Sequence, residues 1–319
     1  MVNLTGKGTD DIDVDSVKVE FAKDTGHDVS YGIQSSSLLA SDLANSICDF
    51  AISIRFNDTA NISNIPLLFS PIAIVYKLSG VKTLRLSSST LAKIFAGQIT
   101  RWNDPEIVAE NTRMAKLLNI AITVLYPSSN MAETYGFTDY LHKTSSEIWT
   151  KWTNTASTSF SSAFPGTIPN LFQSFSSVSQ ATIATLKSTN GAITFMGLKE
   201  AVSYKLTTAY IKNSNNKYVK PTSATATEFI SKAASISSTG EVTFDYAKMN
   251  IGVGYPIVAV YYGLRLTNMT NMDIDKKSTL EGFFEFLVTT FVKNYAYYAK
   301  TSGNNQTQIL NLINKITNS

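Results

Sequence analysis

The segment Leu86–Ile107 (LSSSTLAKIFAGQITRWNDPEI) constrains the local fold more tightly than any other stretch of this chain. Any of the hydroxyls at residues 88–90 can accept a hydrogen bond from the free amides of a first helical turn. The apolar residues that follow are spaced to lie on one face of that helix. Gly97 then fits the left-handed C-cap, and Trp102 can pack back on the helix before the turn at Asp104-Pro105. The segment predicts a short capped helix followed by a fixed turn.

Short apolar strands alternate with helical stretches near the start of the chain. The residues 14–21 fit either a strand or a helix, whereas 38–47 have helical spacing after the three serines at 35–37, which we expect to cap that helix. The strands that this pattern predicts are 4–9, 29–33, 49–54, 65–76, 120–126, 191–195 and 255–266. Strands that alternate with helices in this order predict an α/β fold with a mainly parallel sheet.

The last sixty residues carry one long helical pattern. Ser278 and Glu281 have the spacing of a capping box, in which the serine and the glutamate satisfy amides of the first turn. We expect this helix to run from the capping box to about Lys300, with its phenylalanines buried. The residues 152–179 are rich in serine and threonine and predict a solvated connector.

Length and composition bound the class of protein. A chain of 319 residues is long enough for two lobes with separate cores, and 44% hydrophobic residues indicate a folded protein. The net charge of +3 is too small and too dispersed to indicate a nucleic-acid partner. No apolar run reaches the roughly 20 residues that a membrane-spanning helix needs. We therefore expect neither nucleic-acid binding nor a membrane span in this chain.

The residues of catalytic and metal chemistry are scarce. The single cysteine, Cys48, excludes an internal disulfide and lies in an apolar stretch, which predicts a buried, unreactive thiol. The two histidines, His27 and His142, stand near no carboxylate or nucleophile pattern. We expect no enzyme activity, no metal site and no cofactor.

Asparagines in N-x-S/T sequons suggest a secreted protein. They are candidate glycosylation sites, and they are Asn3, Asn57, Asn61, Asn268 and Asn305. A low content of charged residues and a high content of serine, threonine, asparagine and tyrosine also fit a secreted protein. We expect an extracellular or cell-surface location.

Several strings together resemble the phosphate-binding proteins of bacterial phosphate importers, in the periplasmic-binding-protein superfamily. The segment KIFAGQITRWNDPEI resembles that family's K/Q-I-x-x-W-x-D-P-x-I pattern, and LTGKG, DVSYGIQSSS, CDFAIS, TYGFTDYL and GAITF resemble further family segments. The resemblance implies a two-lobed α/β fold, each lobe a mixed, mainly parallel sheet flanked by helices, joined by two hinge crossings. It assigns 1–74 and 258–319 to lobe I and 75–257 to lobe II.

The resemblance also implies where a ligand would bind. In the family, phosphate lies between the lobes and is held by helix amides, hydroxyls, one arginine and one aspartate, and that aspartate accepts the phosphate proton. Carried over to this chain, the positions on lobe I are Thr9, Asp10, Ser35, Ser36, Ser37, Ile54 and Arg55. Those on lobe II are Tyr126, Ser128, Ser129, Asn130 and Glu133.

The chain departs from the family at the charged positions. Ile54 stands for the aspartate, Tyr126 for the arginine, and Glu133 adds a carboxylate beside the loop. A like-charge contact at ~4 Å costs about 4 kcal/mol at an effective dielectric near 20, so we expect no phosphate binding in the family's manner. We expect instead a solute-binding module whose site holds another small polar ligand. Two alternatives to this expectation stay open. One is a structural or adhesive subunit that self-associates or binds a cell-surface partner, and the other is a true phosphate receptor.

Overall fold

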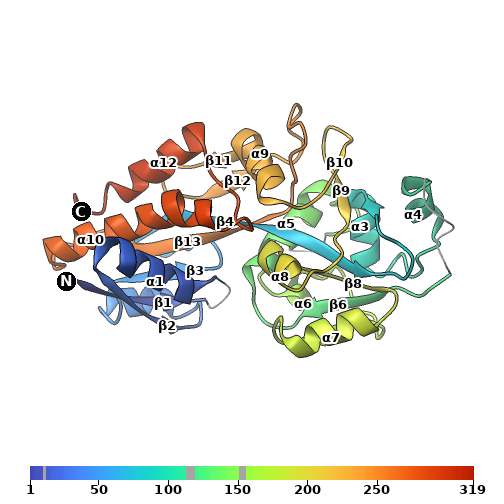
Figure 1. Cartoon of the computed structure of the whole chain (residues 1–319), viewed down its shortest axis with the longest axis horizontal. Coiled ribbons are helices and arrows are strands. Elements are labelled where there is room, and N and C mark those ends of the chain that lie inside the picture. The colour runs from blue at the N-terminus through green and yellow to red at the C-terminus, as the bar shows by residue number, and fades with distance from the viewer. Residues whose placement is uncertain (10–11, 113–118, 151–155) are drawn as a thin grey trace. The chain divides into compact units, whose positions relative to one another are not determined.

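The computed structural model describes residues 1–9, 12–112, 119–150 and 156–319, and the chain forms two compact units (Figure 1). Unit 1 comprises Met1–Phe69, Ala234–Phe244 and Val260–Ser319. Unit 2 comprises Ser70–Ala233 and Asp245–Ala259. Two of the unit boundaries fall inside long strands, β4 (Ile62–Lys77) and β13 (Val258–Leu266), and the other two enclose Ala234–Phe244. The predicted α/β, two-lobed fold class is confirmed.

The sheet of unit 1 has the strand order β2-β1-β3-β13-β4. Its first strands are β1 (Asn3–Gly8), β2 (Asp28–Ile33) and β3 (Phe50–Ser53). Both β2 and β3 run parallel to β1, whereas β13 runs antiparallel to β3. The residues Ala234–Phe244 form a small hairpin of β11 (Ala234–Ile236) and β12 (Val242–Phe244) in the same unit.

Helices flank this sheet and close its core. They are α1 (Val14–Thr25), α2 (Leu39–Ala44), α10 (Ile274–Phe286), the π-helical turn η1 (Leu287–Phe291), α11 (Val292–Asn294) and α12 (Gly303–Ile313). Phe50 of β3 packs edge-on against Phe284 of α10, with ring centroids 5.7 Å apart. Cys48 is 5% exposed and lies in a hydrophobic cluster with Leu43 and Leu264. The prediction of a buried thiol at Cys48 is thus confirmed.

Unit 2 is built on the strand order β4-β8-β6-β7. The strand β8 (Ala192–Gly197) pairs antiparallel with β4 and parallel with β6 (Thr123–Pro127), which pairs parallel with β7 (Gln173–Phe175). A smaller sheet joins β5 (Arg85–Leu86), β9 (Tyr210–Lys212) and β10 (Tyr218–Val219).

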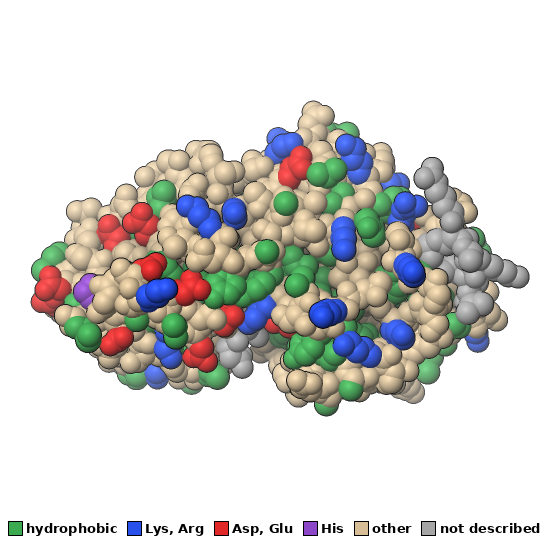
Figure 2. All heavy atoms as spheres, in the orientation of Figure 1, with side chains coloured by type: hydrophobic (Ala, Val, Ile, Leu, Met, Phe, Trp, Pro, Cys, Tyr) green, Lys and Arg blue, Asp and Glu red, His purple; other side chains and the backbone are tan. Residues whose placement is uncertain are grey.

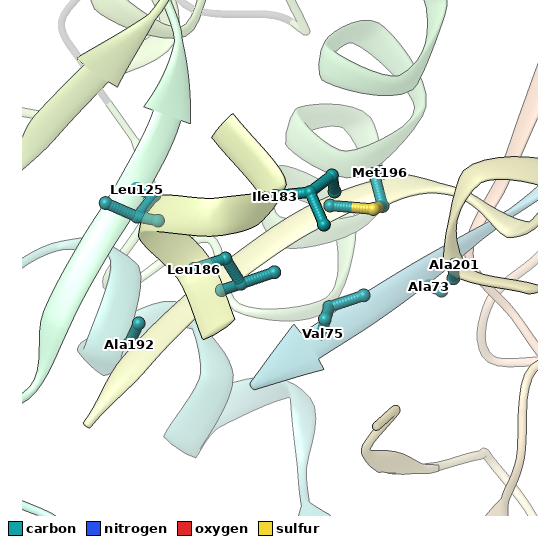
Figure 3. Close-up of a cluster of buried hydrophobic side chains, with 8 residues drawn as sticks. All are labelled: Ala73, Val75, Leu125, Ile183, Leu186, Ala192, Met196 and Ala201. Atoms are coloured by element: carbon teal, nitrogen blue, oxygen red, sulfur yellow. The ribbon is translucent and has the colours of Figure 1, made fainter. Parts of the chain in front are cut away.

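The helices of unit 2 cover both of its sheets. They are α3 (Ser88–Phe95), α4 (Pro105–Glu110), α5 (Ala132–Thr144), α6 (Phe160–Ala163), α7 (Gln180–Ser188), α8 (Leu198–Ser203) and α9 (Ser223–Ala233). Figure 3 shows Ile183 and Leu186 of α7 turned toward Val75 of β4 and Met196 of β8. Burial of these side chains fixes α7 against its sheet.

Local signals predicted several elements well and others only approximately. The residues 14–21, left open between strand and helix, lie in α1. The predicted helix at α3 is confirmed, but its cap is Ser87, whose hydroxyl accepts from the Thr90 amide at 3.2 Å. Gly97 has φ +75°, in the left-handed region that the stop signal predicts.

The helix near the C-terminus differs from its prediction at both ends. The cap is Asp273, whose Oδ1 accepts from the Asp275 amide at 2.8 Å, so the predicted capping box at Ser278 lies inside α10. The helix passes into a π turn and ends at Asn294, not near Lys300. Inside the predicted connector 152–179 the structure places α6 and β7, while residues 151–155 lie outside the described part. Over the residues described, the helices are all too short or too polar to cross a membrane.

Candidate ligand-binding site

The predicted site residues of unit 1 gather at one edge of its sheet. Gly8 pairs with Ile33 of β2 and with Ile52 of β3 in parallel register, so these three strands end together. Thr9, the serines 35–37 and residues 54–55 each follow one of these strand ends. Carboxyl ends of parallel strands are where α/β folds bind ligands. The structure therefore brings these positions to a common edge; Asp10 lies outside the described residues.

Within this edge the serines are held by the loop itself. Ser35 and Ser37 are exposed, and their hydroxyl oxygens lie 2.9 Å apart. The Ser35 amide donates to Oε1 of Gln34 at 2.9 Å. The expectation that these serines cap a helix is wrong, because α2 begins after Leu38 and has no side-chain cap.

The two positions after β3 behave in opposite ways. Ile54 is 4% exposed and belongs to the core, so the place of the family's aspartate is filled by packed hydrocarbon. Arg55 has an exposed side chain, while its backbone is pinned by Ser53, whose hydroxyl donates to the Arg55 carbonyl at 2.7 Å. The Arg55 guanidinium is one cationic group that unit 1 places at this edge, and Lys7, whose Nζ lies 3.2 Å from Oδ2 of Asp42, is another.

In unit 2 the site positions follow β6 and lead into α5. The hydroxyl of Ser128 donates to the Phe175 carbonyl at 3.1 Å, and that of Ser129 donates to the Ser176 carbonyl at 2.7 Å. The Asn130 side-chain oxygen accepts from the Thr158 hydroxyl at 3.3 Å. These bonds hold the loop in shape but leave hydroxyl lone pairs available.

Tyr126 takes part in packing and not in charge. Its ring stacks on Phe160 of α6, with centroids 4.9 Å apart and an interplanar angle of 28°. The place assigned to the family's arginine thus holds a half-buried aromatic ring. Any positive charge for an anion in unit 2 has to come from elsewhere.

The first turn of α5 supplies hydrogen-bond donors. The first amides of an α-helix have no carbonyl partner within the helix, and the cap residue Met131 offers no side-chain bond to them. The Thr134 hydroxyl is fully buried and has no hydrogen-bond partner in the described part of the chain. A first turn of this kind, with the positive end of the helix dipole, suits an anion.

Two carboxylates converge near this turn. A Cβ built on Gly197, at the end of β8, would lie 2.6 Å from Oε2 of Glu200, 3.2 Å from Oε1 of Glu133 and 3.6 Å from Oγ of Ser70. Glu133 and Ser70 are each 4% exposed. Ser70 and Glu200 escaped prediction because nothing local marks them; Thr134, which opens the TYGFTDYL segment, was not among the predicted site residues.

A second glycine, Gly136, allows α5 to pack closely against β13. At Gly136 a Cβ would lie 2.5 Å from the Val258 carbonyl oxygen and 2.9 Å from Cδ1 of Ile72. Only glycine lets the helix approach the β13 backbone so closely.

The sequon asparagines differ in access. Asn3, Asn61 and Asn268 are exposed, and Asn57 is half-buried. Asn305 is 7% exposed, and its amide nitrogen donates to the Ala234 carbonyl at 3.3 Å. The fold argues against Asn305 as a glycosylation site, because the nitrogen that would carry the sugar faces the protein. The other four stay predictions.

The comparisons with known proteins agree on one family. The family described as "PBP superfamily domain" matches residues 2–290. The "Phosphate-binding protein PstS 3" of Mycobacterium leprae is 36% identical over 151 residues, which is 47% of this chain and 38% of that protein. The "Phosphate-binding protein PstS" of Methanocaldococcus jannaschii is 29% identical over 235 residues, covering 70% and 59% of the two chains.

A solved structure shows the same fold. It is titled as a high-affinity periplasmic phosphate-binding protein, PfluDING, bound with phosphate, and it matches with TM-score 0.63 at 18% identity over 98% of this chain and 89% of its own. The alignments span 38% and 59% of these two curated relatives' own lengths. These relatives are named for binding and not for catalysis.

Proposed function

The chain belongs to the PBP superfamily, and on that premise we propose that it is a solute-binding receptor outside the cytoplasmic membrane whose solute is inorganic phosphate. The observation that carries this proposal is the first turn of α5. Its amides and the buried Thr134 hydroxyl form a donor array of the kind that binds oxyanions. The names of the relatives, phosphate-binding proteins from a bacterium and an archaeon, support the same solute.

Glu133 decides how phosphate would be held. At neutral pH phosphate still carries at least one proton, and a carboxylate that accepts this proton makes a short, charge-assisted hydrogen bond. The nearly buried Glu133 beside the donor turn is placed for that acceptor role. Sulfate has no proton to offer, so Oε2 of Glu133, which has no hydrogen-bond partner in the described part of the chain, would stay unsatisfied and sulfate binding would be penalised. In this reading Glu133 replaces the family's aspartate, which Ile54 cannot provide.

A second candidate rests on the substituted positions. Ile54 is packed into the core and Tyr126 is stacked on Phe160, so neither supplies the charge that the family uses. These substitutions favour a small polar solute with less negative charge than phosphate. They also fit the structural alternative, in which the site is vestigial and the protein self-associates.

The test is isothermal titration calorimetry of the purified chain with phosphate, then with sulfate and a panel of neutral sugars and amino acids. The proposal expects phosphate to bind and sulfate to bind at least tenfold more weakly. Binding of a neutral solute without phosphate binding establishes the second candidate. If no compound of the panel binds and the mass measured by light scattering rises with protein concentration, both candidate functions are contradicted. The structural alternative is then supported.

A further inference from the structure

A pocket of about 530 Å³ lies within unit 2, at the opposite end of α5 from its donor turn. Its walls come from the start of α3, the last turns of α5, the end of β9 with the turn that follows, and residues 246–249. The volume falls in the range of small-molecule sites, roughly 300–1,000 Å³. Nothing in the proposed function uses this pocket.

One wall is fixed by side-chain bonds to the backbone. The Asn213 amide nitrogen donates to the carbonyls of Gly252 and Gly254 at 3.2 and 3.1 Å, and its Oδ1 accepts from the Asn215 amide at 3.0 Å. The Ser214 hydroxyl donates to the Lys248 carbonyl at 2.6 Å. The turn after β9 is therefore tied to the 248–254 segment, so the pocket exists before a ligand arrives.

The opposite wall carries the ring of Tyr246 and an ion pair between Lys143 and Asp139. The Tyr246 hydroxyl donates to Oδ2 of Asp139 at 3.0 Å, and the Lys143 ammonium lies 3.0 Å from Oδ1 of the same carboxylate. The Lys143 nitrogen also lies 5.9 Å from the Tyr246 ring centroid, near the outer limit of a cation–π contact. The charge of Lys143 is thus balanced inside the protein.

The positive end of the α3 dipole is also balanced by a carboxylate of the protein. The Glu110 carboxylate accepts from the Ser87 amide at 2.7 Å and from the Thr90 hydroxyl at 2.8 Å. An internal anion therefore already occupies this helix terminus. The α3 end adds hydroxyl groups to the pocket and no unmet positive charge.

Lys212 differs from the other charged groups around the pocket. It stands at the end of β9, is half-buried and lines the pocket. Over the described residues its ammonium forms no ion pair and no side-chain hydrogen bond. One positive charge is left to be matched from outside the chain.

The surroundings reinforce this charge. Over its full sequence unit 2 has 17 Lys and Arg against 9 Asp and Glu, a net +8, whereas unit 1 has 10 against 15, a net −5. Figure 2 shows the Lys and Arg side chains spread over the face of unit 2 in view. A unit with this balance raises the local concentration of anions.

We infer that this pocket is a second binding site, for a small hydroxylated monoanion of the sugar-acid class. The carboxylate of such a molecule would meet Lys212, and its hydroxyls would meet Ser88, Ser214 and Asn216, which also line the pocket. A single unmatched lysine fits one negative charge and not a doubly charged phosphate ester. The inference does not depend on the phosphate proposal, because the two sites lie at opposite ends of α5.

The test is a calorimetric titration with D-gluconate in saturating phosphate, with neutral D-glucose as the comparison ligand. We expect gluconate to bind, glucose to bind at least tenfold more weakly, and Lys212→Gln to weaken gluconate binding at least tenfold. Lys217→Gln is the matched control, since Lys217 is exposed nearby in the turn that follows β9 and is absent from the pocket lining. It should leave the affinity unchanged.

The inference is overturned if gluconate does not bind, if both lysine variants weaken gluconate binding equally, or if glucose binds as tightly as gluconate. Displacement of gluconate by phosphate, with loss of gluconate binding in Thr134→Val, would place the ligand at the α5 donor turn instead and overturn it as well. If gluconate binds normally while the chain fails to bind phosphate, the second site stands and the phosphate proposal falls.

Discussion

The indole nitrogen of Trp102 donates a hydrogen bond of 3.0 Å to the carbonyl oxygen of Gly191, 89 residues later in the chain. Gly191 has φ +99°, and a Cβ there would lie 2.4 Å from the Ala121 carbonyl oxygen. The fully buried tryptophan therefore locks the turn that starts β8 to the turn after α3. The most recognisable tryptophan of the sequence has an architectural role and not a ligand-binding one.

Replacement of Trp102 tests how much this hydrogen bond contributes to the stability of the fold. We expect Trp102→Phe to lower the free energy of unfolding by about 1–3 kcal/mol, since a buried donor is lost along with ring volume. Urea unfolding followed by circular dichroism measures the change. Trp149→Phe is the matched control, because Trp149 is 2% exposed but its indole nitrogen makes no hydrogen bond in the described part of the chain. An equal loss in both variants would show that volume alone matters.

Glu133→Gln separates two roles for that carboxylate. If Glu133 accepts the phosphate proton, the amide should weaken phosphate binding about tenfold or more and narrow the preference over sulfate. If the carboxylate merely repels the anion, the same substitution should strengthen phosphate binding. Calorimetric titration of both anions against wild type and variant gives the sign of the effect.

Thr134→Val tests the donor turn without changing charge. The valine keeps the shape and removes the buried hydroxyl, so we expect phosphate affinity to fall about tenfold, or ~1.4 kcal/mol. Thr138→Val is the control one turn later in α5. The Thr138 hydroxyl already donates to the Thr134 carbonyl at 2.8 Å and accepts from the Ser157 amide at 3.1 Å. Its loss should reduce stability and leave the affinity of the folded protein unchanged; weakening in both variants would argue against a specific hydroxyl contact.

Cys48 should be inert at neutral pH. Burial, with a smaller contribution from the nearby Asp42 charge, raises the pKa of the Cys48 thiol from 9.0 to about 11. The native protein should therefore resist a thiol reagent at pH 8 and react only when unfolded.

The same pKa gives a pH dependence with a defined sign. The folded-state pKa lies above the unfolded value, so the contribution to stability is complete below pH 9 and is lost as the pH rises toward 11. The loss is at most about 2–3 kcal/mol. Urea unfolding of wild type and Cys48→Ala between pH 8.5 and 11 should show a steeper decline in the wild type. Parallel curves would contradict the raised pKa.

Sequence patterns predicted the fold wherever the signals were local. The helix of α3, the stop at Gly97 and the parallel strands near the N-terminus follow from capping, glycine conformation and apolar spacing. The start of α10 was misplaced because Asp273 and Ser278 are both competent caps, and only packing of the phenylalanines decides between them. The hairpin Ala234–Phe244 joins unit 1 through contacts with distant residues such as Asn305, which no local pattern shows.

The sequence predicts that the candidate positions of unit 1 follow parallel strand ends, but it does not predict the hydrogen bonds of the polar groups. Positions after Gly8, Ile33 and Ser53 reach one edge because their strands are parallel. The hydroxyls of Ser128 and Ser129, by contrast, are directed by carbonyls 47 residues away. Long-range partners of this kind decide which polar groups remain for a ligand, and a sequence pattern does not contain them.

The glycine at position 136 has a mechanical consequence. With no side chain between α5 and the Val258 carbonyl, the helix rests on the β13 backbone, and rolling or sliding it would force that backbone to move. The amides in the first turn of α5 therefore keep the same orientation whether or not a solute is bound. Under the proposed function, little conformational entropy is lost at this helix when the solute binds, which favours affinity.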